Sequence, residues 1–203
     1  MSDEQPAGPV PVAETGLLLP AASLALLAAS GEGAGALREF GMVVDDFDAE
    51  FALLSTRLAS SSDPEAALAL EVSEQIVSLA ASAHGWLSVR AMGDDQTPSL
   101  ALLCEQDVLI ARLHGPVVEW VLGDVPAVSR LVRQTVEERG GADVMVTVLS
   151  GGVALGGALF RGDTVDVAAV EQPQLELLAS AAGRGVVDLL AALAELPSGM
   201  ASS

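Results

Sequence analysis

Apolar residues change from a helical to a strand-like spacing at about residue 84. Before that point, Phe51, Leu54 and Leu58 recur every three or four residues, which is typical of a helix with one buried face. Aspartates just before this stripe are suited to cap the start of a helix. The serine- and proline-containing run at residues 60–64 is expected to end it.

The segment before this helix is rich in Leu and Ala. Residues 16–30 predict a short buried helix, placed at residues 21–29, and the glycine-rich run 31–35 predicts a loop that ends it. A membrane span needs about 20 apolar residues, so this short run with an internal proline indicates no membrane insertion. Residues 65–83 leave two interpretations open, because their apolar spacing suits a helix while residues 69–72 suit the start of a strand.

From residue 84 onward, short apolar runs alternate with turn sequences, which indicates strands joined in antiparallel fashion. Two helices are expected among them, one beginning at Asp124 and the last running from Glu171 to Leu196, where Pro197 stops it. The strands are expected at residues 84–90, 99–104, 108–113, 117–122, 144–149, 153–160 and 165–170.

Two parts of this region match each other at an offset of 47 residues. Gly115 and Gly162 stand in corresponding turns, and Asp124 and Glu171 each precede by two residues a proline that opens a helix. The strands between these positions match as well, and Trp120 corresponds to Val167. We therefore predict an α+β fold with a mostly antiparallel sheet in two quasi-repeated halves. Each half ends in a helix, and the N-terminal helices pack alongside.

The expected organisation is one domain between two tails. Residues 1–15, with several prolines and polar residues, predict a flexible lead. Residues 16–197 are expected to form a single α+β domain, with its halves at about 84–139 and 142–196. Residues 198–203 are expected to be a disordered tail.

Composition narrows the function. The 203 residues carry 28 Asp and Glu against nine Arg and no Lys, a net charge of −19, which disfavours nucleic-acid binding. The absence of Lys excludes a phosphate-binding loop and Schiff-base chemistry. The single cysteine, Cys104, excludes an internal disulfide and is expected to be a small buried residue. The acidic N-terminus does not resemble a secretory signal, so a soluble cytoplasmic protein is expected.

Catalytic patterns are sparse. His84 and His114 are the only histidines, and neither belongs to a zinc-ligand spacing. The chain lacks the Gly-x-Ser-x-Gly elbow of a serine hydrolase. We therefore expect no catalytic residues, no metal and no cofactor, while a hydrolase using either histidine stays open as an alternative.

Several segments together resemble the EspG family, the cytosolic chaperones of mycobacterial and related type VII (ESX) secretion systems. The first is the stretch Leu37-Arg-Glu-Phe-Gly-Met-Val-Val-Asp-Asp46, which is followed by a helix and then by Ser-Asp-Pro64. The hairpin strands and acid-capped helix within residues 100–136 are also similar, as is the ending with Pro173-Gln-Leu175. The resemblance covers most of residues 37–196. Family members are longer and carry N-terminal aromatic residues that this chain lacks, so one half is expected to be shortened.

The resemblance implies recognition without catalysis. EspG proteins bind the apolar tip of a helical PPE substrate and keep it soluble, so the implied partner is a helical secreted protein of the PE/PPE or WXG-like type. The expected binding surface combines the loop that holds Asp94, Asp95 and Gln96 with exposed residues on neighbouring strands such as Arg112 and Trp120. Trp120 also fits a core position, and the two aspartates also fit a solvated turn. A homo-oligomeric scaffold or regulatory module, for example a homodimer, is the main alternative.

Overall fold

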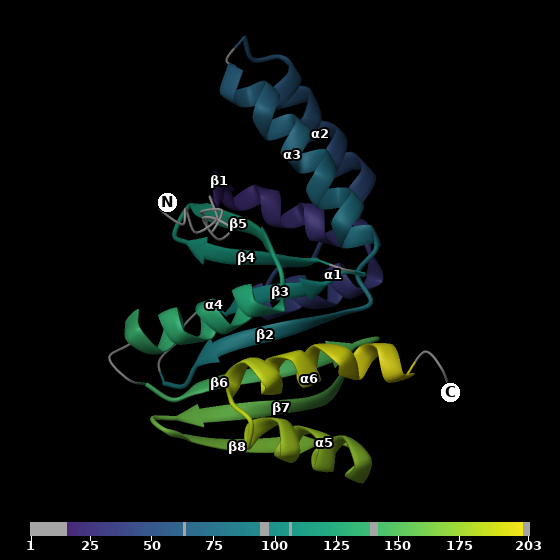
Figure 1. The fold of residues 1–203 in the computed structure, drawn as a ribbon. Coiled ribbons are helices and arrows are strands. Elements are labelled where there is room, and N and C mark those ends of the chain that lie inside the picture. The colour runs from purple at the N-terminus through teal and green to yellow at the C-terminus, as the bar shows by residue number, and fades with distance from the viewer. Residues whose placement is uncertain (1–15, 63, 94–97, 106, 139–141, 201–203) are drawn as a thin grey trace, which may run out of the picture.

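The structure is a computed structural model that describes residues 16–62, 64–93, 98–105, 107–138 and 142–200. Within them, eight strands form one sheet in the order β1-β5-β4-β3-β2-β6-β7-β8, and all neighbouring strands are antiparallel (Figure 1). The fold is α+β, as predicted. The strands are β1 (Leu17–Pro20), β2 (Gly85–Ala91), β3 (Ser99–Leu103), β4 (Val108–His114), β5 (Val117–Gly123), β6 (Val144–Ser150), β7 (Val153–Arg161) and β8 (Thr164–Ala169). The helices are η1 (Ala21–Ala29), α1 (Gly31–Leu37), η2 (Arg38–Phe40), α2 (Phe47–Ala59), α3 (Pro64–Ala81), α4 (Val125–Glu138), α5 (Gln172–Ala182) and α6 (Val186–Met200), of which η1 and η2 are 3-10 helices.

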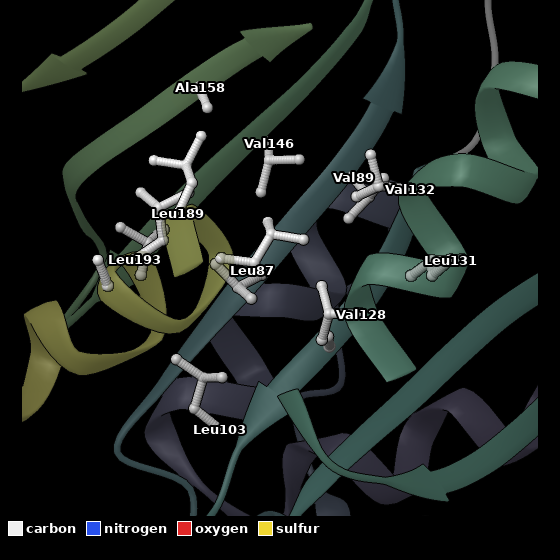
Figure 2. Close-up of a cluster of buried hydrophobic side chains, with 14 of the residues drawn as sticks. Leu87, Val89, Leu103, Val128, Leu131, Val132, Val146, Ala158, Leu189 and Leu193 are labelled. Atoms are coloured by element: carbon white, nitrogen blue, oxygen red, sulfur yellow. The ribbon is translucent and has the colours of Figure 1, made fainter. Parts of the chain in front are cut away.

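Helices cover the two faces of the sheet unequally. Helices α4, α5 and α6 pack on one face, the near face in Figure 1, over a core that spans both halves of the sheet. Figure 2 shows Leu87 and Val146 from the strands among Val128, Leu189 and Leu193 from α4 and α6. On the other face, η1, α1 and α3 build a second core over the neighbouring strands β1, β5, β4, β3 and β2. Helices therefore cover both faces of the half of the sheet formed by β1 to β5, but mainly one face of the half formed by β6 to β8.

Capping explains two of the predicted helices. The Asp46 carboxylate accepts a hydrogen bond from the Ala49 amide at 3.1 Å, which satisfies a free donor at the start of α2. Asp124 does the same for the Ala127 amide at the start of α4, also at 3.1 Å. The ambiguous segment 65–83 is helical up to residue 81, because Ile76 and other apolar residues on one side of α3 are buried.

The N-terminal segment confirms one prediction and contradicts another. The helix placed at residues 21–29 is η1, a 3-10 helix, and residues 17–20 before it form the strand β1, which pairs with β5. The glycine-rich segment predicted as a loop is helix α1. Ser30 caps it by accepting from the Gly33 amide at 3.0 Å, and Gly33 packs so tightly on the Leu27 carbonyl that a side chain has no room. Close approach of two helices therefore explains a glycine that sequence reasoning assigned to a loop.

The C-terminal helix also differs from its prediction. It is interrupted after Ala182, and Gly185, with a φ of 132°, joins α5 to α6. Pro197 lies inside α6 and does not end it, since α6 continues to Met200. The proline ring packs over Gly85 of β2, where a Cβ atom would lie 2.6 Å from the ring. Residues 198–200 of the expected tail are thus helical, and residues 201–203 lie outside the described residues.

The 47-residue repeat holds for local elements but not for side-chain placement. Gly115 and Gly162 have nearly equal φ values of 60° and 54° in corresponding turns. However, Trp120 packs in the core beneath η1, whereas its counterpart Val167 packs toward α5 and α6 on the opposite face. Strands β3 to β5 and β6 to β8 extend from β2 in opposite directions, so equivalent positions face opposite sides.

Candidate functional site

The open face is the side of β6, β7 and β8 opposite to α5 and α6. Helix α1 reaches one corner of it, where Glu32 accepts a hydrogen bond from the Gly151 amide and Leu149 packs against the second core. Val144, Val146 and Val148 point into the core of α4 and α6, so the alternate residues Met145 and Thr147 point the other way. A hollow of about 560 Å³ lies over this side. Its apolar and small lining includes Met145, Thr147, Ala154, Gly157, Leu159 and Ala168.

Glycine makes the middle of the open face hollow. A Cβ atom on Gly157 would lie 2.6 Å from the backbone oxygen of Val146, so the pairing of β7 with β6 requires glycine there. Ala154 and Ala168 are exposed and add only methyl groups, while Met145 is 37% exposed. Apolar surface is therefore left in contact with solvent across three strands.

One end of the open face is charged. The Arg161 guanidinium lies between two carboxylates, with Nε 3.2 Å from Asp143 Oδ2 and Nη1 2.7 Å from Asp166 Oδ2. Asp163 in the adjoining turn is exposed. Arg161 thus pairs with two carboxylates, and Arg90 of the neighbouring strand β2 is paired with Glu39. With Asp163 in the turn, this end of the open face therefore carries more negative than positive charge.

The dimensions of the open face match one helix. Strand β7 has nine residues and is therefore about 30 Å long at 3.3 Å per residue. Three strands spaced by about 4.8 Å present a strip about 10 to 14 Å wide. An α-helix has a diameter of about 10 Å and rises 1.5 Å per residue, so a helix of roughly 15 to 20 residues would cover this strip.

Both predicted binding residues on the strands are buried. The expectation that Arg112 is exposed was wrong, whereas Trp120 occupies the core position that its sequence context also allowed. Arg112 is 8% exposed on the α4 side, where its Nη1 lies 3.3 Å from Glu119 Oε2 and donates to Gln134 Oε1 at 3.0 Å. Trp120 is 3% exposed on the opposite face, and its Nε1 donates to Ser23 Oγ at 2.9 Å. Both hold the fold together.

The predicted loop residues Asp94, Asp95 and Gln96 lie outside the described residues. The open face was not singled out from the sequence. Its signal is the alternation of β7 and β8, in which buried Ala158 and Phe160 are interleaved with Gly157, Leu159 and Arg161.

A smaller hollow of about 210 Å³ lies near the start of β2 and is lined by one histidine, the cysteine and acidic residues. His84, Cys104, Asp107 and Glu195 line it. The Cys104 thiol donates to the Leu79 carbonyl at 3.3 Å, and burial raises its pKa. A thiol held in its protonated form is a poor nucleophile, which disfavours cysteine catalysis at this place.

The two histidines are separated by the sheet register. His84 bonds through its backbone to Leu103 at one end of β3, whereas His114 ends β4 beside Val117 at the far end. The His114 ring lies 3.4 Å from Glu119 Oε2. These histidines therefore belong to different sites.

Neither a metal site nor a membrane-spanning helix is found among the described residues. In the part of the chain that the structure describes, no group of three or more His, Cys, Asp or Glu side chains is arranged to hold a metal ion. Among those same residues, the helices are too short or too polar to cross a bilayer. No protein-family model matches the chain, and no curated protein matches it either.

Proposed function

We propose that this protein is a non-catalytic cytoplasmic chaperone or adaptor, similar to EspG, that binds a helical secreted protein of the PE/PPE or WXG-like type and keeps it soluble. The observation that carries the proposal is the open face, an apolar strip the width of a helix on a strongly acidic molecule. A net charge of −19 favours solubility of a carrier that holds an apolar partner.

Co-expression tests this proposal. The protein is expressed with helical PE/PPE-type and WXG-type secretion substrates from its own host, and soluble complexes are separated by size exclusion. The proposal predicts that a substrate insoluble on its own becomes soluble and co-elutes with the protein. If no secretion substrate of the host co-elutes, the proposal fails.

A homo-oligomeric scaffold is the second candidate, and one observation favours it. Exposed apolar residues also occur on the α2–α3 hairpin, where Leu53 is 47% and Leu68 is 52% exposed. Helix α2 contains no buried residue at all. Light scattering decides between the candidates, because a stable dimer that ignores secretion substrates supports the scaffold.

A further inference from the structure

We propose that the open face binds a single amphipathic helix whose apolar stripe is followed by a cationic residue at the end next to Asp143 and Asp166. This inference rests on the proposed function and specifies the partner's chemistry. Met145 and Leu159 would contact the stripe, and the small residues Gly157 and Ala168 would receive its larger side chains.

Shape selects a helix. The open face is one helix wide and is hollow along its centre, where Gly157 lacks a side chain. A sheet face packs a helix through apolar side chains that stand away from the strands, and Met145, Leu159 and Ala168 supply them. Bulky Leu, Phe or Met side chains on the incoming helix would fill the space over the glycine and the alanines.

Charge selects a basic helix end. Arg161 is already bound by Asp143 and Asp166, and both carboxylates remain partly exposed, with side-chain exposures of 43% and 66%. Asp163 adds a further negative charge in the same turn. A Lys or Arg at the end of the incoming helix would complete a network with two carboxylates, whereas an acidic helix end would be repelled.

The same charges argue against a second copy as the occupant. A second copy that docked through the exposed apolar residues of α2 would also bring the exposed acids at the start of that helix, Asp46, Asp48 and Glu50. Placing them against Asp143 and Asp166 brings like charges together.

The test uses the full chain and two synthetic 18-residue helices with the same leucine stripe, one ending in Lys residues and the other in Glu residues. Affinities are measured by fluorescence anisotropy at low and at physiological salt. We expect the Lys-ended helix to bind about tenfold more tightly at low salt, with a smaller difference at high salt. A scrambled peptide of the same charge and composition should not bind, because it lacks the stripe.

Variants locate the binding site. Ala168→Glu places a charge in the open face at an exposed position and should weaken binding of the Lys-ended helix about tenfold. Asp166→Asn should weaken it about twofold to fivefold. The matched control is Asp188→Asn, which also removes a half-exposed carboxylate paired with an arginine, but on α6. It removes the same single negative charge and should leave affinity unchanged.

Each outcome decides the inference. It is overturned if the two helices bind equally, if Asp188→Asn weakens binding as much as Asp166→Asn, or if Ala168→Glu binds normally. It is also overturned if the protein is a dimer that Ala168→Glu converts to a monomer. Failure of both helices to bind while a secretion substrate still co-elutes would reject the open face and leave the proposed function standing.

Discussion

The hydrogen bond between Trp120 and Ser23 provides a sharp test of the fold, because the sequence allowed Trp120 either on a binding surface or in the core, and it lies in the core. The indole N–H donates to the Ser23 hydroxyl at 2.9 Å and thereby joins β5 to η1. The residues are 3% and 1% exposed, so no water can replace a lost partner without local opening. The substitution Ser23→Ala removes the acceptor and leaves the ring in place.

The magnitude follows from the burial of this pair. A buried donor left without a partner costs about 1 to 3 kcal/mol, so Ser23→Ala should lower the free energy of unfolding by about 2 kcal/mol. For a chain of this size, 1 kcal/mol corresponds to about 2 to 4 °C in Tm. The expected decrease in Tm is therefore about 4 to 8 °C.

Urea unfolding followed by far-ultraviolet circular dichroism measures this free energy. Ser78→Ala, at an exposed position in α3, is the control and should change it by no more than about 0.5 kcal/mol. A double-mutant cycle with Trp120→Phe should give a coupling of about 1 kcal/mol between the two side chains. The reasoning is refuted if Ser23→Ala matches the control, or if Trp120→Phe reduces partner binding without reducing stability.

Three further predictions concern other parts of the fold. Gly185→Ala should destabilise the protein by about 1 to 3 kcal/mol because of its φ of 132°, while Gly183→Ala, at a φ of −65°, should not; thermal unfolding compares them. Asp46→Ala should cost about 1 kcal/mol in urea unfolding by removing the cap of α2. Burial raises the pKa of the Cys104 thiol. The free energy of unfolding should therefore fall as the pH rises through the range in which the unfolded thiol ionises, and Cys104→Ala should remove that dependence.

Much of the sheet could be predicted because its signals are local. Short turns with Gly115 and Gly162 at positive φ fix antiparallel pairing of their flanking strands, and Asp124 caps the helix that follows. These features depend on residues close together in the chain. The strands β2 to β8 and the start of α4 could therefore be predicted from the sequence.

The features that sequence reading missed depend on distant residues. Residues 17–20 form a strand only because β5, far along the chain, offers a partner. Arg112 is a charged residue in a mostly apolar strand and was expected in solvent, but helices cover both faces of that half of the sheet. The alternation along β7 marks one buried side, with Ala158 and Phe160, but whether a helix covers the other side depends on where distant elements pack.

The most direct test of the account is methyl NMR of the protein labelled at its methionines, with and without a co-eluting helical partner. Met145 lies on the open face, while Met42 packs beside the core beneath η1 and α1. The account predicts that the Met145 methyl resonance shifts on binding and that the Met42 resonance does not. A partner that shifts Met42 and leaves Met145 unchanged would contradict it.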